Sequence, residues 1–258
     1  MVVADLHVHT TNSDGTLALS ALPGAARRAG VSAVAITDHD RPHPGLEDPI
    51  AERDGLTVVH GIELRVTAGD QRVDLLGYGV ERTDALVAAC ERLQRDRAAR
   101  GRAIVECLEA RLDVTLPVEI RPGLGRPHIA RAVAEVTDYD VDGVFASLIG
   151  DDGPCYVPRD VPDFERGRRL LAEACAVVGL AHPLRYPNPE AALALCADLD
   201  AVELAYPYGG DPDLGPVERA VDDYDLLITG GSDAHGETLG AAGLDAAAWA
   251  RIREALDA

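Results

Sequence analysis

The sequence predicts an α/β fold in which about seven strands and their helices form a barrel or near-barrel, interrupted by a helical insertion. Two observations lead to this fold class. Short apolar runs alternate with helical patterns up to about residue 82 and again after residue 160, which indicates βα units and a largely parallel sheet. The composition of the stretch between them is instead typical of helices.

Strands are expected where short runs rich in Val, Ile and Leu lie between turn-forming residues. They fall at residues 2–9, 31–37, 56–64, 72–78, 176–182, 200–205 and 226–230. Helices are expected at residues 17–29, 164–175, 189–197, 213–222 and 244–256. Gly30 ends the first of these helices, because glycine readily adopts the left-handed conformation of a helix C-terminus.

The insertion is expected to span residues 83–160, which leaves residues 1–82 and 161–258 to form the barrel. Residues 82–111 are rich in Ala, Arg, Glu and Leu and predict one or two helices. Pro127 favours the start of a further helix through residue 136, and residues 142–149 predict a short one.

The composition is that of a folded globular protein, with 47% hydrophobic residues. No apolar run approaches the roughly 18–20 residues of a membrane-spanning helix, and the first residues show no secretory signal. The five cysteines are scattered, odd in number and without a CxxC pair, so we expect free or buried thiols in a reducing compartment. A cytoplasmic enzyme that does not bind membranes is the expectation.

The charge balance is strongly acidic, with 44 Asp and Glu against 24 basic residues, all of them Arg, and a net charge of -20. Such a charge repels polyanions at long range and argues against a protein that coats long nucleic acids. Acidic, lysine-free surfaces resemble those of proteins from salt-loving organisms, where screening mutes self-repulsion. A local basic pocket for a small phosphorylated substrate is compatible with this balance.

Metal-ligating side chains gather at the ends of the expected strands, where parallel α/β folds place their ligand sites. His7 and His9 form an H-x-H on the first strand, and both rings point to one face, about 6.5–7 Å apart. Further candidates follow the first, second, third, fifth and last strands. They are Asp14, His39, Glu63, His182, Asp233 and His235. This recurrence predicts one shared metal site.

Six motifs, in order along the chain, resemble the PHP (polymerase and histidinol phosphatase) superfamily. They are HVH at 7–9, ITDHD at 36–40, GIE at 61–63, GRPHIARA at 125–132, AHPLRY at 181–186 and GSDAHG at 231–236. The stand-alone phosphoesterases that act on nucleotides or short RNA 5′ ends are the most similar subgroup, which residues 151–162 (DDGPCYVPRDVP) also resemble. The resemblance implies a distorted (β/α)7 barrel of PHP type with a mainly helical insertion.

The resemblance also implies a trinuclear centre held by nine side chains. One ion would be held by His7, His9, Glu63 and Asp233, a second by Asp14, His39 and His235, and a third by Glu63, Asp74 and His182. Asp233, His235 and Glu63 would be the catalytic residues. Imidazole and carboxylate ligands suit Mn²⁺, Fe²⁺ or Zn²⁺. Two to three such ions are the expected cofactors, and activity is expected with Mn²⁺.

Three positions depart from the family pattern. Asp74 stands where His is usual, and carboxylate is also a metal ligand. Arg41 and Arg65 stand where small hydroxyl residues are usual. We assign no role to either arginine, nor to His43 and His60.

Substrate binding is assigned to three further residues. Arg126 and His128 lie at a predicted helix start, where free N–H groups and the helix dipole favour an anion. Arg185, three residues after His182, is another candidate for binding phosphate.

The predicted function is hydrolysis of a phosphomonoester on a nucleotide-like substrate, AMP or a 3′,5′-bisphosphate nucleotide, by metal-activated water. Three alternatives stay open: 5′-to-3′ exoribonuclease action on short RNA, histidinol-phosphate phosphatase, and a non-catalytic metal-binding regulatory module. The sequence does not predict an oligomeric state.

Overall fold

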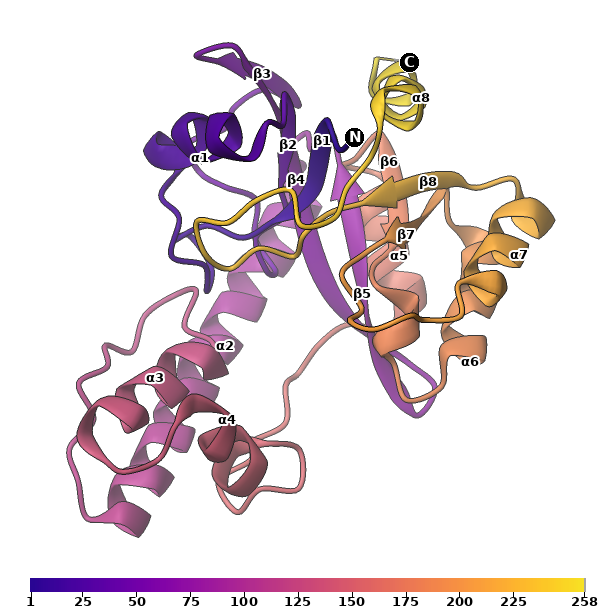
Figure 1. Cartoon of the computed structure of the whole chain (residues 1–258). Helices are drawn as coiled ribbons and strands as arrows, with labels where there is room; N and C mark the ends of the chain where they lie inside the picture. Colours follow the sequence, from indigo (N-terminus) through magenta and orange to yellow (C-terminus); the bar gives the residue numbers. More distant parts are fainter. Residues whose placement is uncertain (258) are drawn as a thin grey trace. The chain divides into compact units, whose positions relative to one another are not determined.

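Eight strands form one curled sheet in the computed structural model, which describes residues 1–257 (Figure 1). The strand order is β1-β2-β4-β5-β6-β7-β8, and β3 pairs with β4 off this path. The strands are β1 (Ala4–Val8), β2 (Ala33–Ile36), β3 (Ile50–Arg53), β4 (Leu56–Ala68), β5 (Gln71–Tyr78), β6 (Val177–Leu180), β7 (Ala201–Ala205) and β8 (Leu227–Gly230).

Apart from β3, the sheet is parallel within each half and antiparallel where the halves join. β1, β2 and β4 are mutually parallel, as are β6, β7 and β8, but β5 runs antiparallel to both β4 and β6. The expectation of a largely parallel sheet therefore fails at β5. Gly69 and Asp70 make a two-residue hairpin between β4 and β5, with Gly69 at φ +60°.

β3 is a strand that the sequence reading missed. It pairs antiparallel with the start of β4 through the turn Asp54-Gly55, and both turn residues have positive φ. An Asp-Gly pair between two strands is a standard signal for a two-residue hairpin. The signal was therefore present, but the run Ile50–Arg53 contains two charged residues and lacks a buried face.

The curled sheet closes where its two ends meet. The N–H of His9 donates to the Ala234 carbonyl at 2.9 Å, and the N–H of Ala234 donates to the His7 carbonyl at 3.3 Å. A second bridge joins Ala4 to Leu244. The end of β1 and the segment after β8 therefore lie side by side, and the predicted α/β fold with a distorted barrel is confirmed.

Helices of the same part of the chain cover this sheet. They are α1 (Leu22–Ala29), α5 (Phe164–Ala172), α6 (Pro189–Ala194), α7 (Gly215–Tyr224) and α8 (Ala246–Leu256), with 3₁₀ turns at Leu19–Ala21, Pro183–Arg185 and Leu195–Asp198. The apolar side of α1 packs with Val34 and Ile36 of β2 in one cluster. Ile252 of α8 packs with Leu6 and Tyr78 in another. Burying each such side chain contributes about 1.5–3 kcal/mol.

The chain divides into two compact units. Unit 1, which contains the sheet, is Met1–Ala88 and Val161–Ala258, and unit 2 is Ala89–Asp160. Most of α2 (Asp84–Leu112) lies in unit 2, with α3 (Arg126–Val136), α4 (Val141–Val144) and a π-helical turn at Phe145–Ile149. Unit 2 has its own apolar core, which includes Leu108, Ile129 and Val133.

A disulfide in unit 2 corrects the expectation that all cysteines are free. Cys107 of α2 and Cys155 are bonded, with Cα atoms 5.7 Å apart. Their sequence separation of 48 residues gave no signal, because only the folded helices bring the two positions together. Cys90, Cys175 and Cys196 are not part of a disulfide.

No helix within residues 1–257 combines the length and the apolarity that crossing a bilayer requires.

Candidate metal centre

The end of the curled sheet in unit 1 brings together residues that are far apart in sequence. β1 carries His7 and is followed by His9, β4 carries Glu63, and Asp233 follows β8. Where the sheet closes, the backbone at Gly231 lies against that of His7, and a Cβ atom on Gly231 would be 2.3 Å from the His7 backbone nitrogen. Only glycine allows so close an approach of two backbones.

Glu63 is the centre of the cluster and is almost completely buried. Its Oε1 atom lies 3.6 Å from His7 Nε2 and 3.1 Å from His182 Nε2. Its Oε2 atom lies 3.4 Å from His9 Nε2 and 2.7 Å from His39 Nδ1. One carboxylate therefore contacts four imidazoles, an arrangement suited to a ligand that bridges ions.

A first group of ligand atoms surrounds Asp233. Its Oδ1 atom lies 3.2 Å from His9 Nε2 and 3.6 Å from His7 Nε2. These two histidines and Glu63 have ligand atoms within 4.8 Å of one another. The structure thus brings together the four residues predicted to hold one ion.

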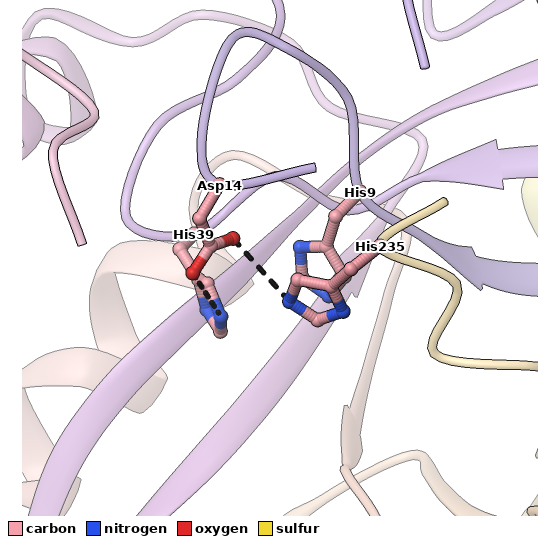
Figure 2. Close-up of side chains that lie close together, drawn as sticks. All are labelled: His9, Asp14, His39 and His235. Carbon is pink, nitrogen blue, oxygen red and sulfur yellow. Dashed lines mark ion pairs between the residues drawn. The ribbon is translucent and has the colours of Figure 1, made fainter. Parts of the chain in front are cut away.

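A second group surrounds Asp14, as Figure 2 shows. Asp14 Oδ2 lies 3.7 Å from His39 Nε2, and Asp14 Oδ1 lies 3.3 Å from His235 Nε2. His9 stacks on His235 with ring centroids 4.2 Å apart. The three residues predicted for a second ion therefore meet, and His9 lies between the two groups.

The third predicted group is Glu63, Asp74 and His182, whose ligand atoms also lie within 4.8 Å of one another. Asp74 Oδ2 is 3.9 Å from His182 Nε2. Both oxygens of Asp74, however, accept hydrogen bonds from Arg65: Nε donates to Oδ1 at 2.7 Å and Nη2 donates to Oδ2 at 2.5 Å. This group differs from the other two because a cation of the chain already binds one of its members.

The first two groups fit divalent ions. His7 Nε2 is a buried atom without a hydrogen-bond partner among residues 1–257. Buried polar atoms almost always have partners, so this nitrogen indicates a ligand. Imidazole nitrogens with carboxylate oxygens are the donor set of Mn²⁺, Fe²⁺ and Zn²⁺ sites.

Charges in the cluster shift several pKa values. Burial raises the pKa of Glu63, but the neighbouring His39 and His7 outweigh burial and hold that pKa well below its usual value. Burial lowers the pKa of His7, but Glu203, Asp233 and Glu63 outweigh it and hold the pKa well above normal. Metal binding to such a cluster displaces protons from its imidazoles.

Glu203 on β7 orients two of the predicted ligands and was missed from the sequence. Its Oε1 atom lies 3.0 Å from His7 Nδ1, and its Oε2 atom accepts the His182 N–H at 2.8 Å. Because Nδ1 of His7 faces Glu203, Nε2 faces the centre, the usual arrangement of a histidine ligand and its carboxylate partner. The sequence offered one signal, a Glu inside the apolar strand Ala201–Ala205, but not the fact that its side chain is fully buried.

Asp38, also fully buried, holds the loop that carries Asp14. Its Oδ1 atom accepts the Thr10 N–H and the Ser13 hydroxyl, both at 2.7 Å, and its Oδ2 atom accepts the Thr10 hydroxyl at 2.7 Å and the Asn12 amide at 3.0 Å. Asp5 acts similarly on the loop after β8, accepting bonds from the N–H and hydroxyl of Ser232 at 2.9 and 2.6 Å.

Arg185 lies beside the centre. Its Nη1 atom donates to the Tyr206 hydroxyl at 2.6 Å and to Asp233 Oδ2 at 3.2 Å, and the Tyr206 hydroxyl donates to the same oxygen at 2.8 Å. The Arg185 side chain is 55% exposed, so its other nitrogens reach solvent. The structure therefore places this predicted substrate residue next to a predicted ligand.

Arg126 and His128 lie in unit 2, at the N-terminus of α3. Arg126 donates to the Ile149 carbonyl and to Asp151, and His128 Nδ1 accepts the Gly125 N–H at 3.1 Å. His128 lines a cavity of about 270 Å³ together with Arg121 and Arg131, among other residues. These contacts place both residues within unit 2 alone.

Comparison with known proteins agrees with this geometry. The family model "PHP domain" matches residues 5–122. The chain is 30% identical over 253 residues to the phosphoribosyl 1,2-cyclic phosphate 1,2-diphosphodiesterase of Eggerthella lenta, covering 92% of this chain and 95% of that protein. It is 27% identical over 251 residues to the 3′,5′-nucleoside bisphosphate phosphatase of Chromobacterium violaceum, and the match covers 91% of this chain and 88% of that protein.

Two further similarities extend the comparison. The 5′-3′ exoribonuclease Rnm of Escherichia coli is 30% identical over 197 residues, covering 72% of this chain and 67% of that protein. The structure of an assigned metal-dependent phosphoesterase from Bifidobacterium adolescentis superposes on this chain with a TM-score of 0.80 at 26% identity. The match covers 99% of this chain and 96% of that protein. These similarities and the ligand cluster together show that the chain belongs to the PHP family and is a phosphoester hydrolase.

Proposed function

We propose that this chain hydrolyses a phosphomonoester of a nucleotide-like substrate, AMP or a 3′,5′-bisphosphate nucleotide. The observation that carries the proposal is the cluster around Glu63, where imidazoles and carboxylates from distant parts of the chain place their ligand atoms within 4.8 Å of one another in each group. The Chromobacterium violaceum relative, similar over 91% of this chain, favours a bisphosphate nucleotide.

Two groups of residues would hold the ions: His7, His9, Glu63 and Asp233 in one, and Asp14, His39 and His235 in the other. Divalent ions bound there supply acidified water and neutralise phosphoryl oxygens. We propose Mn²⁺ for the assay, and the donor set also suits Fe²⁺ and Zn²⁺. The trinuclear alternative depends on Asp74.

The chain's own residues would bind and orient the substrate. Asp233 and His235 face the centre from the loop after β8, and Glu63 faces it from β4, so we propose these three as catalytic. Arg185, anchored by Tyr206 and half exposed, is proposed to bind a phosphoryl oxygen. The carboxylate of Glu203 holds His7 in the tautomer that a metal ligand requires.

Arg126 and His128 are proposed to bind the anionic part of the substrate. Support comes from the arginines of unit 2: burial, with the neighbouring Arg126, Arg159 and Arg97, lowers the pKa of Arg100 to about 9. Mutual repulsion among guanidinium groups favours an anion among them. In a chain of net charge -20, this local gathering of cations fits a small phosphorylated partner better than a long nucleic acid.

A cytoplasmic location and a halophilic type of surface are also proposals. The acidic, lysine-free composition supports the second. The Cys107–Cys155 disulfide is the observation that weighs against the first, because reducing compartments keep thiols reduced.

The test is a panel of phosphoesters incubated with the Mn²⁺-loaded protein. The panel contains AMP, a 3′,5′-bisphosphate nucleotide, phosphoribosyl 1,2-cyclic phosphate, histidinol phosphate and a 5′-phosphorylated oligonucleotide. We expect the fastest phosphate release from the bisphosphate nucleotide or AMP. Faster turnover of the cyclic phosphate or of the oligonucleotide would instead assign the activity of those relatives, and no turnover of any compound would refute catalysis.

Asp233→Asn should abolish turnover and leave the fold intact. Asp233 has φ +51°, and Asn adopts this left-handed conformation as readily as Asp, so the backbone is unstrained by the change. Asp222→Asn, on the exposed side of α7, is the matched control and should retain activity. Unaltered activity of Asp233→Asn would refute its role.

A further inference from the structure

Two departures from the family pattern meet in the folded chain. Arg65 on β4 and Asp74 on β5 are direct cross-strand partners in the antiparallel pair. Directly opposed residues of an antiparallel pair share one face of the sheet and interact side chain to side chain. Arg65, where the family has a small hydroxyl residue, and Asp74, where it has His, are therefore one contact rather than two unrelated changes.

The contact engages Asp74 completely. Arg65 binds it side-on, with Nε on Oδ1 at 2.7 Å and Nη2 on Oδ2 at 2.5 Å. Paired N–H donors of this kind are the strongest arrangement between Arg and a carboxylate. The Asp74 side chain is 1% exposed, so water does not compete for its oxygens. A guanidinium stays protonated in proteins, so the charge of Arg65 is permanent.

The pair lies where a third ion would bind. The Asp74 oxygen that accepts Arg65 Nη2 is the one 3.9 Å from His182 Nε2, and His182 is 3.1 Å from Glu63. A divalent ion on this oxygen would share it with a guanidinium, and two cations on one oxygen repel each other strongly in a buried site. The residues present therefore do not fit a third ion.

We infer that the centre takes two divalent ions and that the Arg65 guanidinium provides the positive charge at the third position. Asp74 uses Nε and Nη2 of Arg65, so Nη1 lies outside that pair and is suited to donate to a phosphoryl oxygen of the substrate. The anion-binding part of this inference rests on the proposed function. The number of ions does not, because it is measured without substrate.

The first test counts bound ions. The protein is stripped with a chelator, reloaded with Mn²⁺, freed of excess metal and analysed by elemental mass spectrometry. We expect about two Mn²⁺ per chain in the wild type and in Asp74→Asn, which keeps a hydrogen bond to Arg65. Three ions in the wild type, or the loss of one ion in Asp74→Asn, would overturn the inference. Arg253→Ser, which removes the exposed pair with Asp257, is the control.

The second test measures binding of inorganic phosphate to the Mn²⁺-loaded protein by calorimetry. The double variant Arg65→Gln/Asp74→Asn removes both charges but keeps two polar side chains that can hydrogen-bond to each other, so the fold should survive. Loss of the guanidinium should weaken phosphate binding about tenfold while two ions remain. Unchanged phosphate affinity would overturn the role of Arg65. Two ions without any turnover in the substrate panel would refute the proposed function and leave the ion count standing.

Discussion

Glu203→Gln should weaken metal binding although Glu203 itself contacts no proposed ion. The carboxylate accepts two N–H groups, one from the His7 ring and one from the His182 backbone. A Gln side chain has one oxygen, so whichever way its amide turns, one of the two donors faces an NH₂ group. His182 has φ +27°, a strained conformation that this hydrogen bond helps to hold.

The size of the effect follows from the bond that is lost. A hydrogen bond to a charged group contributes about 1.5–3 kcal/mol. If that loss falls on the orientation of His7, metal affinity drops about 10- to 100-fold, the range known for carboxylate partners of metal-binding histidines. Any part that falls on folding instead lowers the thermal stability of the metal-free protein.

The assay is a Mn²⁺ titration in competition with a fluorescent chelator, paired with thermal unfolding of the metal-free protein. Glu218→Gln on the exposed side of α7 makes the same chemical change away from the centre and should behave as wild type. If Glu203→Gln matches the wild type in both metal affinity and stability, the orienting role of Glu203 is wrong.

Three further predictions concern stability. Asp38→Asn weakens about two of the four hydrogen bonds that Asp38 accepts. The free energy of unfolding, measured in urea, should fall by about 2–3 kcal/mol. An unchanged urea concentration at the unfolding midpoint would contradict this. His60 is fully buried, and burial lowers its pKa to about 4. An unfolded His has a pKa of about 6.5, so the unfolded chain binds the proton first. The free energy of unfolding therefore falls by about 3 kcal/mol as the pH drops from about 6.5 to about 4. His60→Leu should remove this fall in stability. If the free energy of unfolding changes with pH in the same way in the variant and the wild type, the prediction is refuted. Reduction of the Cys107–Cys155 disulfide should destabilise unit 2 by about 4 kcal/mol. Amide hydrogen exchange in unit 2 should become faster, and unchanged exchange rates would contradict the prediction.

The positions of the candidate ligands were predictable because strand ends have a sequence signature. An apolar run followed within a few residues by His or Asp recurs at His9, His39, His182 and Asp233, and parallel strands bring such ends together. The positions of β1, β2, β4 and β8 followed from the same runs. Geometry then added what spacing alone cannot, namely which atoms of Glu63 face which rings.

Other features depend on contacts that no local pattern encodes. The Arg65–Asp74 pair requires the antiparallel register of β4 and β5, which the expectation of a parallel sheet excluded. The disulfide requires the fold of unit 2. Glu203 was passed over because alternation within a short apolar strand does not tell a buried carboxylate from an exposed one.

The meeting of β1 with the segment after β8 has a consequence for how the protein is made. His7 and His9 are synthesised long before Asp233 and His235. A nascent chain that ends before Asp233 therefore lacks one member of each group of candidate ligands. Complete candidate metal sites are in this way reserved for chains in which the segment after β8 has paired with β1, through the bridges from His9 to Ala234 and from Ala4 to Leu244.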